Sequence, residues 1–259
     1  MSNTKKQKRS PLERKPLRNP GQSLQQYIQH VHNLQEMPLA AMIAMAVAIA
    51  IDEWWRHFAA RPPQPIGATL IAAVVVACCV YQLSVLRKRL TSLQLGLDGE
   101  KTIGQLLEAN RRNDWHVFHD IPCNRGNIDH VLIAPQGVFA IETKTRSKPA
   151  EGEPIVTYNG ESVKFKDSKP DRKPIIQARA VRDWLREFLH NYTATDYPVR
   201  GVVIPLGWYV QSSKDGRPID NIWVLNEKAF LKWFDNEPVV LSPLQIARAS
   251  EDLTAFVTR

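Results

Sequence analysis

Two short apolar segments of this chain carry charged residues where buried strands are expected. Residues 127–134 read NIDHVLIA and residues 138–144 read VFAIETK, so Asp129, Glu142 and Lys144 stand among aliphatic and aromatic neighbours. Two carboxylates that meet can bind a hard divalent cation such as Mg²⁺, and a nearby ammonium can stabilise charge on a reacting phosphate. These residue types suit metal-assisted phosphodiester hydrolysis. On a solvated sheet face they would instead form an ordinary cross-strand ion pair.

The turn between the two segments decides whether these side chains meet. It reads Pro-Gln-Gly (135–137), and proline at the second position with glycine at the fourth favours a type I turn in an antiparallel hairpin. A turn centred between the proline and the glutamine places Asp129 opposite Glu142, whereas a bulge at the glycine shifts that register by one residue. Glu142 and Lys144 share a face because strand side chains alternate. Charged side chains buried among apolar strands need partners. This requirement favours a catalytic or metal site over a solvated ion pair.

The surrounding residues predict a mixed α/β domain that would hold this hairpin in place. A helix over 96–110 and a strand over 115–121 precede it. After it, the patterns predict a hairpin over 155–166 around an Asn-Gly turn, a helix over 174–192, strands over 199–205 and 221–226, a helix over 227–234 and a last helix from an N-cap at Ser242 to about residue 257.

Three segments resemble the nuclease-related domain (NERD) family of the PD-(D/E)XK nuclease superfamily. They are GLDGE (96–100), GNIDHVLIAPQGVFAIETK (126–144) and KPIIQ (173–177), and the resemblance covers about residues 95–205. It implies a restriction-endonuclease-like αβββαβ core acting on nucleic acid, DNA above all. It also implies a catalytic set of Glu100, Asp129, Glu142, Lys144 and Gln177, in which Asp129, Glu142 and Glu100 hold Mg²⁺ or Mn²⁺ and Gln177 is accessory.

A basic stretch lies beside these residues. Between 144 and 186 there are eleven Lys and Arg residues against six Asp and Glu. Such residues can contact phosphates, or they can simply form a solvated hairpin and helix face. The candidates for nucleic-acid binding are Lys148, Lys164, Lys166, Lys169, Arg172, Lys173, Arg179 and Arg182. His130 should point to the sheet face opposite Asp129 and have a structural role.

The overall charge gives no further sign of DNA binding. The 259 residues include 34 Lys+Arg and 26 Asp+Glu, for a net charge of +8. The whole excess lies before residue 90, so the high isoelectric point is not a nucleic-acid signature. Cys78, Cys79 and Cys123 have the spacing of neither a disulfide framework nor a zinc site, which indicates a reduced, cytosol-facing protein.

The excess charge flanks two apolar runs. Residues 66–86 form a run of 21 without any charge, the length of a transmembrane helix. The 14 residues of 38–51 are compatible with a short span, a re-entrant segment or a buried helix. Trp54 and Trp55 suit a membrane interface and favour a span over about 38–55. Because Lys and Arg lie mainly outside the resulting hairpin, both termini are expected in the cytoplasm, with the protein crossing the inner membrane twice.

The predicted organisation is an α/β domain preceded by two transmembrane helices. It comprises a basic, disordered cytoplasmic tail over 1–37 that contacts anionic lipids, a transmembrane hairpin over 38–89, a NERD-like domain over 93–210, and a strand and helices over 211–259 that pack on it. The predicted function is a membrane-anchored, metal-dependent nuclease that hydrolyses DNA at the cytoplasmic face. The alternative is a catalytically silent, membrane-tethered adaptor of the same fold that binds nucleic acid or protein. The oligomeric state stays open.

Overall fold

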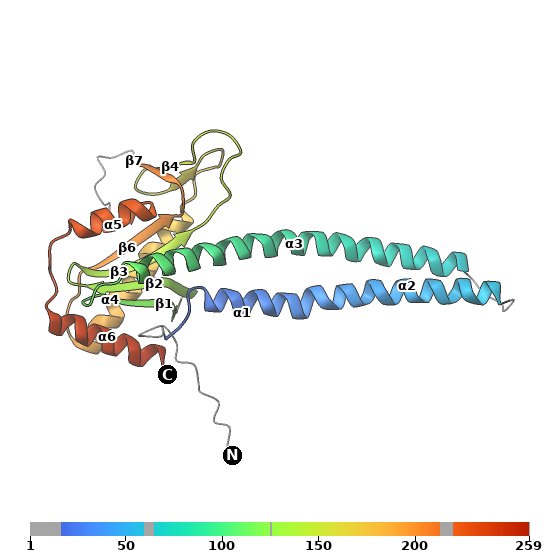
Figure 1. Cartoon of the computed structure of the whole chain (residues 1–259), viewed down its shortest axis with the longest axis horizontal. Helices are drawn as coiled ribbons and strands as arrows, with labels where there is room; N and C mark the ends of the chain where they lie inside the picture. The colour runs from blue at the N-terminus through green and yellow to red at the C-terminus, as the bar shows by residue number, and fades with distance from the viewer. Residues whose placement is uncertain (1–16, 60–64, 125, 213–219, 259) are drawn as a thin grey trace, which may run out of the picture. The chain divides into compact units, whose positions relative to one another are not determined.

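The chain folds into two compact units. The computed structural model describes residues 17–59, 65–124, 126–212 and 220–258. One unit is the helical pair over 21–100, and the other is an α/β domain formed by 101–258 with 17–20 (Figure 1). Helix α3 (Pro65–Ala109) contributes residues to both units. An α/β domain preceded by long apolar helices confirms the predicted fold class.

The first member of the helical pair is one nearly continuous helical stretch. It consists of α1 (Gln22–Val31), the π-helical turn η1 (His32–Glu36) and α2 (Met37–Phe58). The amide of Met37 donates to the carbonyl of His32, five residues back. This wide turn directly precedes Pro38, whose ring nitrogen cannot donate a helical hydrogen bond.

The prediction of a disordered tail over 1–37 is therefore wrong for residues 22–36, which are helical. Leu24, Ile28 and Val31 are less exposed than the residues between them and follow helical spacing, so this segment has an apolar face to pack. Leu24 lies against α3 near Gly96. The basic residues before position 17 lie outside the described part of the chain.

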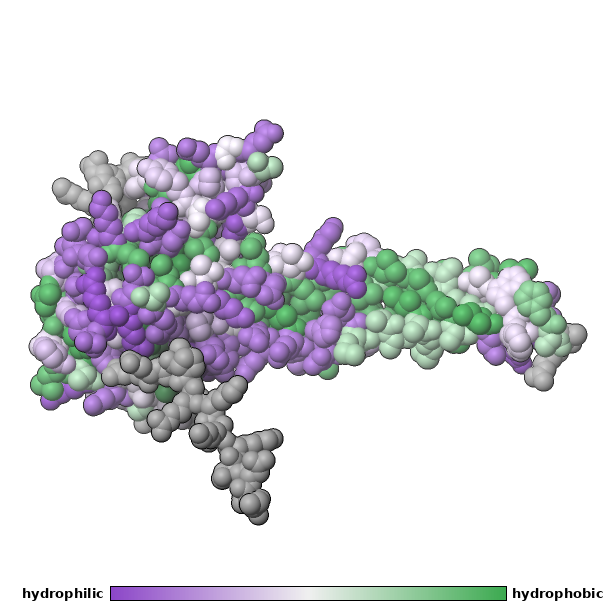
Figure 2. All heavy atoms as spheres, viewed as in Figure 1, coloured by the Kyte–Doolittle hydropathy of each residue, from purple (hydrophilic) through white to green (hydrophobic). Residues whose placement is uncertain are grey.

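Two helices are long and apolar enough to cross a membrane, judged by length and composition. They are the stretch Gln22–Phe58 and helix α3. Figure 2 shows apolar side chains gathered over the part of this pair nearest its connection. The indole nitrogen of Trp54 donates to the Thr69 hydroxyl at 3.0 Å and links the two helices there. α3 continues without a break from the expected span over 66–86 into the expected helix over 96–110.

The α/β domain is built on a five-stranded sheet with strand order β1-β2-β3-β6-β8. β1, β2 and β3 form an antiparallel meander, and β6 and β8 run parallel to β3. The strands are β1 (His116–Cys123), β2 (Gly126–Ala134), β3 (Gly137–Lys144), β6 (Val199–Pro205) and β8 (Ile222–Val224). All five were predicted from the sequence.

Helices cover both faces of this sheet. α4 (Lys173–Thr193), which connects β3 to β6, and α6 (Pro243–Val257) pack on the face that presents Val138 and Ala140. The last turns of α3 and helix α5 (Glu227–Asp235) pack on the other face, which presents Phe139 and Ile141. β3 is thus apolar on both sides, as a central strand should be. The predicted N-cap of the last helix is confirmed, because Ser242 forms a capping box with Gln245.

A second, three-stranded sheet lies beside the first. The predicted hairpin over 155–166 forms β4 (Ile155–Tyr158) and β5 (Val163–Phe165), which pair antiparallel. β7 (Tyr209–Ser212) was not predicted, and it pairs parallel with β4. Four residues, of which only Val210 is partly buried, are too few to give an alternation of apolar and polar positions. Pairing with a distant strand makes this segment extended.

Gly201 on β6 allows α4 to approach the sheet closely. A Cβ atom at this position would lie 3.0 Å from the carbonyl oxygen of Ala178 on α4 and 2.5 Å from Cδ1 of Ile222. Gly201→Ala should therefore lower the free energy of unfolding by about 1–3 kcal/mol, the range for overpacking a core. Chemical denaturation in detergent would measure it. Gly67→Ala, where a Cβ meets no atom within 4 Å, is the matched control, and equal losses in both variants would contradict this packing argument.

Candidate active site

The β2–β3 hairpin has the register that was predicted from its turn. His130 faces Ile141, and the pairing continues regularly to Ala134 and Gly137 without a bulge. The ladder ends at the His130 pair, so Asp129 lies one residue beyond it. There its Oδ2 accepts a hydrogen bond of 2.7 Å from the backbone amide of Thr143. This bond fixes the Asp129 carboxylate at the end of β3.

Glu142, Lys144 and Gln177 meet at the same end of β3. Lys144 Nζ donates to Glu142 Oε1 at 2.6 Å and to Gln177 Oε1 at 3.1 Å. Gln177 lies in the second turn of α4, the helix that crosses this face of the sheet. Asp129 also acts on Lys144 through its charge. Four of the five residues proposed as catalytic are therefore neighbours in the folded domain.

The Glu142 carboxylate is buried, with 2% of the residue exposed. Burial raises the pKa of Glu142, and the charge of Lys144 opposes that shift without cancelling it. Burial works to lower the pKa of Lys144, but Glu142 and Asp129 outweigh it and hold that pKa above its ordinary value. The second carboxylate oxygen, Glu142 Oε2, is buried and has no hydrogen-bond partner among the described residues.

An acceptor oxygen left without a donor inside a protein is unfavourable, and a bound cation would remove that penalty. The described residues contain no group of three or more His, Cys, Asp or Glu side chains placed to hold a metal ion. Mg²⁺, however, often binds through only one or two carboxylates and keeps several water ligands. Asp129 and Glu142 are thus suited to Mg²⁺ or Mn²⁺ as a pair of carboxylates.

Glu100 belongs to the helical unit and not to the described α/β unit. It lies well inside α3, although the sequence predicted it near a helix start. Glu100 is half-buried and lies close to Gly21. A Cβ atom added at Gly21 would lie 3.0 Å from Glu100 Oε2. Its place in the catalytic set stays a prediction from the family resemblance.

The basic candidates divide into two groups. Arg172 pairs with Glu161 at 2.6 Å, and Arg179 pairs with Asp220 at 2.9 Å. Arg182 is only 8% exposed and pairs with Asp183, so its prediction as a nucleic-acid contact is not supported: a buried, neutralised guanidinium cannot reach a phosphate. The five lysines are exposed and form no ion pair with any described residue: Lys148, Lys164, Lys166, Lys169 and Lys173.

A buried histidine pair lies on the opposite face of the sheet. His119 Nδ1 and His130 Nδ1 are 2.8 Å apart, so one of them must carry the proton that the other accepts. His119 Nε2 contacts Glu108 Oε1 at 3.2 Å, and this hydrogen bond, together with Arg111, holds the pKa of Glu108 below its ordinary value. The sequence assigned His119 no role. Its position opposite His130 in the β1–β2 register is the signal that would have revealed the pair.

Residues 95–205 match the family model NERD, described as the nuclease-related domain. This segment is therefore similar to a nuclease-related domain. The match contains all five residues of the predicted catalytic set and runs from α3 to the end of β6. No curated protein and no solved structure matches the chain. The matched segment includes the β2–β3 hairpin, α4 and β6.

The raised pKa of Glu142 predicts a pH dependence of stability. A carboxyl whose folded-state pKa is raised lowers the free energy of unfolding once the same carboxyl ionises in the unfolded chain. This loss grows as pH rises above the ordinary pKa of 4.5. It levels off above the folded-state pKa. Glu142→Gln removes this cost. The unfolding free energy of the variant should therefore rise relative to wild type between acidic and neutral pH.

Urea denaturation at several pH values would measure this difference. Glu187→Gln makes the same chemical change at an exposed position on α4 and should show no comparable trend. A difference between Glu142→Gln and wild type that stays constant over this pH range would contradict the assignment.

Proposed function

We propose that this protein is a membrane-anchored nuclease that hydrolyses phosphodiester bonds of DNA at the cytoplasmic face of the inner membrane, with Mg²⁺ or Mn²⁺ held by Asp129 and Glu142. The observation that carries the proposal is the buried Glu142 oxygen without a partner, beside a charged lysine in a NERD domain. A nuclease-related domain supports the reaction class, and the finer assignment rests on these side chains.

Each side chain at the site has a task in this chemistry. A bound divalent ion would supply Lewis acidity and make a bound water more acidic. Lys144 is held by Glu142 and Gln177, and its ammonium would donate to a phosphate oxygen or orient the attacking water. The Thr143 amide keeps the Asp129 carboxylate in place before substrate arrives. The reacting phosphate would thus meet donors that need no rearrangement.

The buried carboxylate favours an enzyme over a binding adaptor. A protein that only binds DNA uses positive charge to attract phosphates. Two carboxylates beside the bound phosphate would weaken such binding, and Glu142 also bears the penalty of burial. A metal-dependent hydrolase is the function in which these groups are useful.

The anchoring part of the proposal rests on the helical pair. Two helices are long and apolar enough to cross a membrane. Arg87, Lys88 and Arg89 follow the second apolar run, and seven Lys and Arg residues precede the first. By the positive-inside rule, this distribution supports a hairpin with both ends in the cytoplasm. The NERD domain follows that end directly in the chain.

Removing the proposed catalytic groups should abolish cleavage without unfolding the domain. Glu142→Ala and Lys144→Ala should each reduce DNA cleavage by about a hundredfold or more, because each removes a group that stabilises the transition state. The measurement is cleavage of labelled DNA by the purified full chain in detergent, with Mg²⁺, with Mn²⁺ and with chelator. Glu187→Ala is the control.

Cleavage that persists in both variants, or that is insensitive to chelator, would refute the assignment. DNA binding without cleavage by the wild-type chain under all these conditions would support the adaptor instead. Circular dichroism of each variant would verify that the fold persists.

The exposed lysines predict a salt-dependent contact with DNA. Lys164→Ala, Lys166→Ala and Lys169→Ala should each weaken binding about equally for all sequences and lower the slope of log affinity against log salt by about 1. Fluorescence anisotropy at several salt concentrations would measure this in a Glu142→Ala background, which prevents cleavage. Lys232→Ala on α5, also exposed, is the control. A salt slope that is unchanged in all three variants would place the DNA elsewhere.

A further inference from the structure

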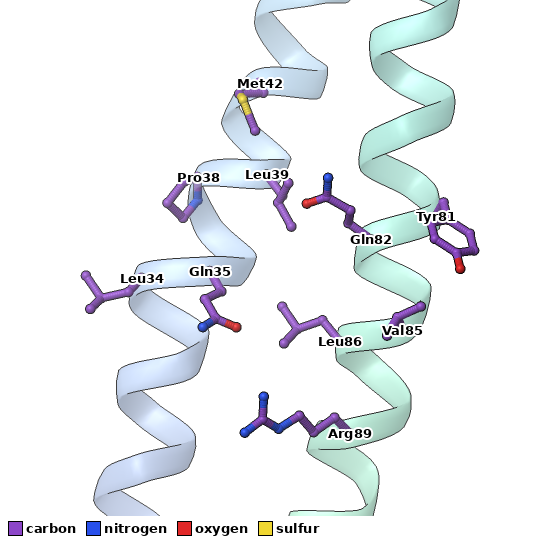
Figure 3. Close-up of a pocket in the computed structure, with 10 residues that line it drawn as sticks. All are labelled: Leu34, Gln35, Pro38, Leu39, Met42, Tyr81, Gln82, Val85, Leu86 and Arg89. Carbon is purple, nitrogen blue, oxygen red and sulfur yellow. The ribbon is translucent and has the colours of Figure 1, made fainter.

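A groove opens between the two apolar helices, where the first apolar run begins and the second one ends. It has a volume of about 570 Å³ and lies entirely within the helical unit. Figure 3 shows Gln35 and Leu39 from one helix, and Gln82, Leu86 and Arg89 from the other, pointing into the space between them. The groove therefore combines an apolar wall with three polar side chains.

Two of the three polar side chains in the groove have no hydrogen-bond partner among the described residues. Gln35 and Gln82 are exposed and form no hydrogen bond with any described residue. In a membrane an amide without a partner is unfavourable, because lipid chains offer neither donor nor acceptor. Arg89 donates to the Tyr27 hydroxyl, which occupies only part of a guanidinium with five N–H donors. An occupant of this groove must therefore supply hydrogen-bond acceptors.

The groove runs from apolar side chains at one end to Arg89 at the other (Figure 3). Leu39 and Met42 lie within the first apolar run, and Tyr81 and Val85 are in the last turns of the second. Arg89 lies at the opposite end, just beyond residue 86, where the uncharged run stops (Figure 3). An acyl chain would fit the apolar part, ester carbonyls would fit the glutamine amides, and a phosphate would fit Arg89.

The local charge favours an anionic occupant. Arg87, Lys88 and Arg89 are consecutive, and Arg87 is paired with Glu36 at 3.4 Å. Lys88 is exposed and forms no ion pair with any described residue. A second copy of the chain presenting the same groove would bring its own Arg89 to the site, and like charges repel. An anionic lipid has the opposite charge.

We propose that this groove binds one anionic phospholipid, with its phosphate at Arg89, its ester region at Gln35 and Gln82, and an acyl chain along Leu39 and Met42. The proposal rests on the membrane anchoring proposed above. It adds a specific lipid site to an anchor that otherwise needs only bulk lipid.

Photo-crosslinking would test the site in the full chain reconstituted into vesicles of phosphatidylcholine. A phosphatidylglycerol with a photoreactive acyl chain, present at a low mole fraction, should label peptides that contain Met42 or Tyr81. A phosphatidylcholine probe at the same fraction should label them about fivefold less, the size expected from one arginine near an anionic headgroup. Mass spectrometry would locate and quantify the adducts.

Matched variants distinguish a site from general attraction. Arg89→Gln should reduce phosphatidylglycerol labelling to the phosphatidylcholine level, and Gln82→Leu should also reduce it. Lys88→Gln removes the neighbouring charge without lining the groove and should leave labelling nearly unchanged. Equal labelling by both lipids, or equal loss in Lys88→Gln and Arg89→Gln, would overturn the lipid site.

Alkaline extraction of the same vesicles separates this proposal from the anchor. A wild-type chain that stays in the membrane but shows no lipid preference would overturn the lipid site alone. A chain that alkali removes from the vesicles would overturn the membrane anchoring and the lipid site together.

Discussion

The partly buried ion pair between Glu142 and Lys144 is the constraint on which the candidate site depends. Two charges taken out of water gain less from each other than they lose in hydration unless further hydrogen bonds hold them. Here Gln177 supplies one more acceptor to the lysine, while one oxygen of Glu142 receives no donor from the described residues. Apolar side chains at both positions would be at least as stable. The pair is therefore a weak source of stability, and the stability must come from elsewhere in the domain.

That stability comes from the strand that carries the pair. β3 lies between β2 and β6, and helices cover both of its faces, so Phe139 and Ile141 pack on one side while Val138 and Ala140 pack on the other. A one-residue slip in the β2–β3 ladder would exchange those faces. The same register that buries this core brings the Asp129 carboxylate to the amide of Thr143. Core and site are thus specified by one pairing.

Much of this arrangement was predictable because it is local. The turn at 135–137 fixes the hairpin register, and alternation places Glu142 and Lys144 on one face. The features that were not predictable depend on distant contacts. β7 is extended because it pairs with β4. Residues 22–36 are helical beside α3. Arg182 is buried by partners that include Asp220. The spacing of residue types along the sequence does not indicate which distant segments become neighbours in the fold.

The proposed chemistry also explains why an anchor would matter. In the proposed mechanism the bound cation, Lys144 and the exposed lysines all contact phosphates, which are alike in every DNA sequence. A site built this way discriminates poorly among DNA molecules in a cytoplasm that holds the cell's own genome. Discrimination then has to come from location. Arg89 of the groove between the two helices and Glu100 of the predicted catalytic set lie on one continuous helix, about 16 Å apart at the helical rise per residue. On this proposal, attachment to the membrane restricts which DNA the enzyme meets, and the choice of substrate is made by the anchor rather than by the active site.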